Sequence, residues 1–448
     1  MSLKKARVGL ISLGCAKNQV DSECMNAELE RAGFELTDDL TLAEAVVVNT
    51  CGFIRPAKEE SIETILQAAR LKQDGNLKVL AVVGCLAQRY LKELKRELPE
   101  VDIFLGVGAE QKDLPSRLRR ALGLDQKETA GCGPVIQARR VETITRGWAY
   151  LKISEGCDNR CAYCAIPLIR GGLDSRPLRG LVEEARWLEG LGARELNLIA
   201  QDVTAWGTER GERLVALLER LLDETAIPWI RLLYMHPAHI DENLLEFMAA
   251  HPRVLPYIDM PVQHASDHVL AAMGRGVPRA RLLELVTRAR ELLDSPVLRT
   301  TVLVGFPGER KRDFEELLDF VAEARFDRLG GFIYSAEEDT RASSLRETVS
   351  RAEKERRLEA VLGLQRSISA EIQQERVGQS LEVLVEQPVP PPERPSPEYR
   401  WAGRSRAHAP EVDGWVYLSG GRPNPGRIMR AKVIESGDYD LFARAERG

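Results

Sequence analysis

Three cysteines spaced C-x-x-x-C-x-x-C, at Cys157, Cys161 and Cys164, are the residues whose types and spacing most directly indicate chemistry. Such a loop can bind three irons of an iron–sulfur cube and leave the fourth iron without a protein ligand. Structural zinc normally takes four closed ligands, and a ferredoxin run supplies four thiolates. The open iron can bind the amino and carboxylate groups of S-adenosylmethionine (AdoMet), and one electron then yields a 5′-deoxyadenosyl radical.

A second group of three cysteines follows from a different pattern. Residues 6–123 alternate short apolar runs with amphipathic segments, which favours a small parallel α/β sheet. Cys15, Cys51 and Cys85 each close one of the first three runs, and each stands beside a glycine. Since ligands collect at the carboxyl edge of such sheets, we expect these thiols to form a second metal site. The alternative is three buried structural cysteines, because free cysteine is often buried.

The two remaining cysteines are assigned no metal. Cys24 lies in a predicted helix and is interpreted as a plain core or surface thiol, and Cys132 lies in a glycine-rich stretch that we interpret as linker. Eight cysteines in 448 residues are too few for a disulfide scaffold, so clustered cysteines indicate metal in a reducing compartment.

The elements that must position the 157–164 loop begin near Trp148. Apolar runs predict six strands that alternate with amphipathic helical stretches, which indicates a partial (β/α)6 TIM-like barrel with the cysteine loop directly after its first strand. The strands are predicted at 150–153, 195–200, 230–235, 257–260, 300–304 and 329–334. A long charged helix over 351–376 is expected to close this domain.

The tail after residue 378 differs from the rest. Five short runs separated by turn residues, at 381–386, 399–407, 414–418, 428–434 and 441–445, predict a small antiparallel β-barrel. The fold class is therefore α/β multidomain. The predicted division is an N-terminal cluster domain (5–123), a linker (124–147), the partial barrel (148–377) and the C-terminal barrel (378–448).

Composition excludes several classes of protein. The net charge is −5, and the tail carries equal numbers of acidic and basic residues, so no global attraction to nucleic acid or anionic membrane is expected. No apolar run reaches the roughly 18 residues of a spanning helix. We expect no membrane partner and a cytoplasmic location.

Two three-cysteine groups in this order, followed by a small β-barrel, resemble the radical-AdoMet methylthiotransferases, whose C-terminal module is a TRAM domain. The resemblance covers nearly the whole chain and is carried by three stretches, Ser12–Asn18, Val47–Phe53 and Lys152–Cys157, and in the tail by Ala409–Leu418. It is strongest to the branch that adds a methylthio group to the β-carbon of an aspartate in a small-subunit ribosomal protein, the twelfth. That branch commonly has proline at the position of Ala16 and leucine at that of Gln19.

The resemblance implies two 4Fe-4S clusters, one on Cys15, Cys51 and Cys85 and one on Cys157, Cys161 and Cys164. It also implies AdoMet contacts at Tyr163, which fills the aromatic position before the last cysteine, and at Gly305 and Glu309 in a glycine segment after a barrel strand. An ordinary turn is the alternative for that segment. No acid–base catalytic residue is predicted, since an unactivated C–H bond offers no proton to a side-chain base.

The implied partners are the ribosomal protein substrate and an electron donor such as a flavodoxin. RNA contact through the C-terminal barrel is a further expectation. Two rival functions stay open at this point. One is a methylthiotransferase that modifies an adenosine of transfer RNA, and the other is a non-catalytic iron–sulfur RNA-binding scaffold.

Overall fold

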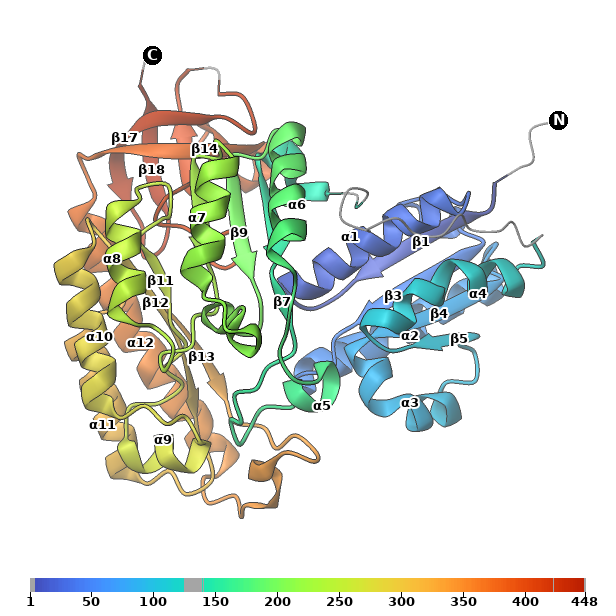
Figure 1. Cartoon of the computed structure of the whole chain (residues 1–448), viewed down its shortest axis with the longest axis horizontal. Helices are drawn as coiled ribbons and strands as arrows, with labels where there is room; N and C mark the ends of the chain where they lie inside the picture. The colour runs from blue at the N-terminus through green and yellow to red at the C-terminus, as the bar shows by residue number, and fades with distance from the viewer. Residues whose placement is uncertain (1–4, 125–138, 140, 422, 447–448) are drawn as a thin grey trace.

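The computed structural model describes residues 5–124, 139, 141–421 and 423–446, and Cys132 and most of the predicted linker lie outside them. Figure 1 shows three parts: an N-terminal α/β layer in blue, a strand–helix barrel from green to orange, and a C-terminal β module in red. None of the described helices combines the length and the apolar character needed to cross a membrane.

The N-terminal part is a five-stranded parallel sheet in the order β2-β1-β3-β4-β5. Strands β3 and β4 are buried along their whole length, as expected for a parallel sheet covered on both faces. Helices α1 and α4 cover one face and helices α2 and α3 cover the other. The strands are Arg7–Ser12 (β1), Glu35–Leu36 (β2), Ala45–Thr50 (β3), Val79–Gly84 (β4) and Ile103–Leu105 (β5), and the helices are Ala16–Arg31 (α1), Arg55–Asp74 (α2), Cys85–Glu97 (α3) and Leu114–Ala121 (α4).

The central part is the predicted partial barrel. Its six strands form two parallel three-stranded sheets, β6-β9-β10 and β11-β12-β13, and an isolated parallel bridge pairs Ile230 of β10 with Val254, just before β11. The strands are Trp148–Lys152 (β6), Glu195–Ile199 (β9), Trp229–Leu232 (β10), Tyr257–Asp259 (β11), Val297–Val304 (β12) and Arg328–Ile333 (β13). A small hairpin, Ser154–Glu155 (β7) with Asp174–Ser175 (β8), frames the cysteine loop.

Helices wrap the outside of the barrel, and the largest core of the molecule lies between them and the strands. They are Ile166–Arg170 (α5), Leu178–Leu191 (α6), Leu214–Glu224 (α7), Glu242–Ala250 (α8), Asp267–Met273 (α9), Arg279–Leu292 (α10), Lys311–Ala324 (α11) and Arg351–Glu375 (α12). Strand β10 ends three residues earlier than predicted. The strand stops because Tyr234, which tertiary hydrogen bonds hold in a left-handed backbone (φ 65°), cannot continue it.

The C-terminal module is a closed five-stranded barrel in the order β14-β15-β16-β18-β17. The strands are Ser380–Pro388 (β14), Tyr399–Ser405 (β15), Val416–Ser419 (β16), Ile428–Ser436 (β17) and Leu441–Ala445 (β18). Four neighbouring pairs are antiparallel as predicted, and β16 with β18 is parallel. An odd number of strands cannot alternate direction all the way around a closed barrel, so one parallel pair is unavoidable.

Buried ion pairs fix this module to the amino ends of the central strands. Arg404 donates to Glu195 of β9 at 2.6 Å and also to Glu386 of β14, while Arg231 of β10 donates to the other oxygen of Glu195 at 2.8 Å. All four side chains are at most 1 % exposed. The indole N–H of Trp148 donates to Glu386 at 3.0 Å, which satisfies a further lone pair.

Replacing Arg404 by methionine should destabilise the protein by about 3–5 kcal/mol, because Glu195 and Glu386 would keep buried charge without a full set of partners. Denaturant unfolding followed by tryptophan fluorescence measures this. The matched control is Arg220→Ala, which breaks an exposed i,i+4 pair with Glu224 and should cost under about 1 kcal/mol. Equal midpoints for the two variants would contradict the importance of the buried network.

Candidate metal centres

The first three thiols lie at one edge of the N-terminal sheet. Cys15 and Cys51 follow the adjacent strands β1 and β3, and Cys85 follows the next strand, β4, as the first residue of α3. Two glycines permit this approach: a Cβ on Gly14 would lie 3.2 Å from the Cys51 sulfur, and one on Gly52 would lie 2.9 Å from the backbone of Cys85. The strand-end pattern therefore does bring Cys15, Cys51 and Cys85 together.

The three thiols differ in their electrostatic surroundings. Enclosure by protein raises the pKa of Cys51 to about 11, and it raises the pKa of Cys85 against the opposing charge of Arg170. For Cys15 the desolvation is outweighed by the charge of Lys17 and by the backbone N–H groups of Asn18 and Lys17, so its pKa is lowered. The first turn of α1 thus favours the thiolate that a metal requires.

The second set lies in the loop between β7 and α5. Backbone hydrogen bonds tie this loop to the barrel, from Cys157 N–H to Gly171 at 3.2 Å and from Ala162 N–H to Met273 at 2.8 Å. The Asn159 amide donates to Asp202 at 2.7 Å. Desolvation raises the pKa of Cys157, and it raises that of Cys164 to about 12. These bonds fix the backbone of the loop, and its three cysteines are free thiols.

The two sets adjoin each other. Cys85 packs against Ala165 and Ile169, and Ala165 directly follows Cys164. At the end of the short helix α5, Arg170 donates to the Cys85 sulfur at 3.4 Å. Figure 1 shows α5 beside α3, between the barrel and the N-terminal layer. The third thiol of the sheet and the residues that directly follow the barrel cysteine loop therefore meet at one junction.

A set of buried and half-buried ion pairs joins the two sides of this junction. Arg170 pairs with Asp21 of α1 at 3.1 Å and with Glu155 of β7 at 2.6 Å. Lys152 of β6 pairs with the same two carboxylates, at 2.8 Å in the case of Glu155. The side-chain amide of Asn18 adds a hydrogen bond to this set, because its Oδ1 accepts from Arg170 at 2.7 Å. The sequence pattern gave no signal for Arg170, because one arginine after a cysteine loop is not distinctive.

An arginine also reaches the second sulfur set. Arg275 donates to the Cys161 sulfur at 3.5 Å and to the carbonyl of Pro261. Enclosure by protein and the neighbouring Cys161 sulfur raise the pKa of the Tyr163 hydroxyl. The Tyr163 ring packs against an apolar cluster that includes Met273 and Phe306. Each cysteine set thus has one buried guanidinium directed at a thiol.

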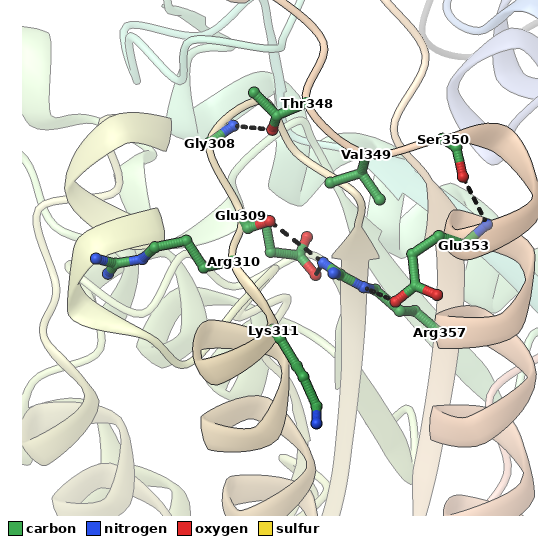
Figure 2. Close-up of a pocket in the computed structure, with 9 residues that line it drawn as sticks. All are labelled: Gly308, Glu309, Arg310, Lys311, Thr348, Val349, Ser350, Glu353 and Arg357. Carbon is green, nitrogen blue, oxygen red and sulfur yellow. Dashed lines mark hydrogen bonds and ion pairs between the residues drawn. The ribbon is translucent and has the colours of Figure 1, made fainter.

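The glycine segment after β12 forms a braced turn. One oxygen of Glu309 accepts the N–H groups of Gly305 and Phe306, and the other accepts from Arg357 at 2.6 Å. A Cβ on Gly305 (φ 75°) would collide with the side chain of Lys354. Figure 2 shows Glu309 and Arg357 in the wall of a pocket of about 520 Å³ next to this turn. In this structure the Glu309 carboxylate is fully occupied by the turn and by Arg357.

A group that the sequence analysis did not single out lies beside the barrel cysteine loop. Ligand atoms of Asp202, His236 and His239 lie within 4.8 Å of one another. Both Asp202 oxygens already accept hydrogen bonds, one from Thr204 and the other from Asn159 and from the His239 ring at 2.7 Å. We interpret this group as the support of the loop at Asn159. Its position after a barrel strand was the available signal.

The thiols fit iron–sulfur clusters better than single ions. Within the described residues, neither cysteine set places its three sulfurs within 4.8 Å of one another, whereas zinc–sulfur bonds of about 2.3 Å require convergence on one point. A cluster spreads its thiolates over separate irons and adds negative charge. Arg170 and Arg275 supply hydrogen bonds to sulfur and positive charge at the two sets, which is how proteins support such clusters.

Family models match three stretches of the chain. Residues 7–106 match the uncharacterized protein family UPF0004, residues 151–321 the radical SAM superfamily, and residues 377–445 the TRAM domain. Among solved structures, the radical S-adenosylmethionine methyltransferase TsrM from Kitasatospora setae superposes with a TM-score of 0.56 at 17% identity, over 76% of this chain and 77% of that one. That likeness shows the fold. Fold and site together define a radical-AdoMet enzyme with an added N-terminal thiol site.

Sequence relatives define the family more narrowly. The ribosomal protein uS12 methylthiotransferase RimO of Myxococcus xanthus is 44% identical over 97% of this chain and 90% of its own length. The protein of that name from Desulforudis audaxviator is 44% identical over 98% of this chain and 97% of its own. The chain belongs to the RimO family of radical-AdoMet methylthiotransferases, which use AdoMet and two iron–sulfur clusters.

Reconstitution without oxygen should load about eight irons per chain, four on each set. Replacing Cys157, Cys161 and Cys164 together by alanine should remove half of the iron and acid-labile sulfide, because the first set lies on another part of the fold. The control is Cys24→Ala, whose thiol packs against the barrel instead of joining either set, and which should keep full loading. Iron retained in full, or lost entirely, in the triple variant would contradict two independent centres.

Proposed function

We propose that this enzyme adds a methylthio group to the β-carbon of an aspartate in ribosomal protein uS12. The observation that carries the proposal is the identity to uS12 methylthiotransferases over nearly the whole chain. The proposed ligands are Cys15, Cys51 and Cys85 for one cluster and Cys157, Cys161 and Cys164 for the other, with Tyr163, Gly305 and Glu309 around AdoMet. Bound there, the clusters and AdoMet supply the radical and the methylated sulfur that an unactivated C–H bond requires.

The chain itself contributes position and shielding. Asp21, Lys152, Glu155 and Arg170 hold the N-terminal sheet against the barrel, which keeps Cys85 beside the helix that follows the second thiol set. Residues of α1 and of the C-terminal barrel complete the apolar lining of the barrel interior, where they limit water around a reactive centre. Arg170 and Arg275 offset the negative charge of the two sulfur sets. No side chain is required to remove a proton from carbon.

We also propose that the predicted division at 5–123, 124–147, 148–377 and 378–448 describes the domains of the enzyme. The electron needed for AdoMet cleavage comes, in this proposal, from a donor such as a flavodoxin. Because the substrate belongs to the ribosome, we place the reaction in the cytoplasm. Stacked Tyr417 and Phe442 (ring centroids 5.7 Å apart), near the exposed Arg444, support RNA contact through the C-terminal barrel.

The reconstituted enzyme should convert uS12, in the presence of AdoMet and a low-potential reductant, into a product heavier by one methylthio group in place of hydrogen. Tandem mass spectrometry should place the addition on an aspartate, and 5′-deoxyadenosine should accumulate with it. A uS12 variant with that aspartate changed to asparagine is the substrate control. Modification of transfer RNA with untouched uS12 would favour the adenosine-modifying rival, and absence of 5′-deoxyadenosine would favour the scaffold.

A further inference from the structure

Lys17 is a buried cation without an acidic partner. Its side chain lies in the first turn of α1, the residue is 8 % exposed, and no carboxylate in the described parts of the chain lies within 4 Å of its Nζ. Neighbouring cations are paired: the half-buried Lys152 and the buried Arg170 with Asp21 and Glu155, and the buried Arg139 with Glu23. Although burial opposes it, the Lys17 ammonium lowers the pKa of the Cys15 thiol two residues away. Because a buried ammonium group is costly without a carboxylate or other full counter-charge, this exception leaves Lys17 able to bind an arriving anion.

The Lys17 ammonium rests on an aromatic ring from the barrel. Its Nζ lies 3.4 Å from the centroid of the Tyr234 ring, a close cation–π contact that spans two domains. A ring face stabilises a cation without neutralising it. The ammonium therefore keeps its capacity to bind a carboxylate while its position is fixed.

The backbone of Tyr234 is strained and held on several sides. Its φ of 65° is unusual for a bulky residue. The Tyr234 N–H donates to the Asp259 carboxylate at 2.8 Å, its carbonyl accepts from Val203 at 3.1 Å, and the Met235 N–H donates to the Asp259 carbonyl at 2.8 Å. Strain that is fixed by so many bonds is characteristic of functional sites. Here its effect is to aim the ring at Lys17.

The pair is connected to both thiol sets. Lys17 is two residues from Cys15, and Tyr234 follows β10 at the carboxyl end of the barrel, where its carbonyl meets the Asp202–Thr204 turn that supports the second cysteine loop through Asn159. Figure 1 shows the start of α1 beside the barrel, next to β7. The other buried cations near this space are occupied: Arg170 and Arg275 contact sulfur, and Arg299 pairs with Asp259 at 2.7 Å.

We propose that Lys17, supported by Tyr234, binds the side-chain carboxylate of the substrate aspartate. The inference rests on the proposed function and names the residue that selects its substrate. In an aspartate the β-carbon is bonded directly to the carboxyl carbon, so anchoring the carboxylate at Lys17 also positions the reacting C–H bond. An asparagine or an uncharged base would leave the ammonium group unpaired, which disfavours both.

Peptide binding tests this inference without turnover. A uS12-derived peptide with its target aspartate, and the same peptide with asparagine, would be titrated against the cluster-loaded enzyme by fluorescence anisotropy. We expect Lys17→Met to weaken binding of the aspartate peptide by about 30-fold, the usual scale for removing one partner of a buried charge pair, and to leave the asparagine peptide unchanged. Lys17→Arg should restore part of the difference.

Two further variants separate an anchor from a structural role. Tyr234→Leu removes the ring but keeps Lys17, and it should reduce the preference for aspartate over asparagine. Lys58→Met is the matched control, because Lys58 also lies over a tyrosine, Tyr90, but pairs with Glu337. It should bind both peptides as the unaltered enzyme does. Iron content and 5′-deoxyadenosine formed without peptide establish whether each variant is loaded.

The outcomes distinguish the two proposals. If the unaltered enzyme prefers the aspartate peptide and Lys17→Met keeps that preference, the carboxylate anchor is wrong while the proposed function stands. Equal losses for both peptides would also overturn the anchor, since they would show a general role at the Cys15 site. If the unaltered enzyme binds neither peptide and leaves uS12 unmodified, the proposed function fails and the anchor fails with it.

Discussion

The contact between Arg170 and Cys85 is the interaction on which the rest of this structure depends. It joins a residue six positions after the last cysteine of the barrel loop to a thiol of the N-terminal sheet. It thereby brings the helix that follows the barrel cysteine loop against the edge of the N-terminal sheet. The guanidinium is held by Asp21, Asn18 and Glu155, so its direction is set from both sides of the junction.

Arginine and lysine take different positions around the sulfurs, and the difference follows from the chemistry of the two side chains. Arginines, which stay protonated and donate in fixed directions, are directed at thiols, while Lys17 lies on an aromatic ring with no acidic partner among the described residues. Fixed donors suit a permanent group such as a cluster. A single compact charge suits a group that must arrive and leave.

Much of the fold could be predicted because its signals are periodic. Alternating runs predicted both α/β parts, and cysteines at strand ends or in a short loop predicted which thiols gather. The residues that complete the site carry no such signal. Arg170, Arg275 and Lys17 act through contacts with distant elements, and the early end of β10 comes from tertiary bonds that hold Tyr234 in a left-handed backbone. The parallel β16–β18 pair follows from barrel closure, which no local pattern shows.

The way the C-terminal barrel is attached fixes its distance from the cysteine loop. Glu195 is the first residue of its strand and Arg231 lies within the next, so Arg404 attaches the module to the floor of the central barrel, at the opposite end of the strands from the cysteine loop. A module fastened by fully buried charges cannot swing like a tethered arm. In the proposed RNA contact, the module would therefore hold its ligand at a fixed distance from the cysteine loop.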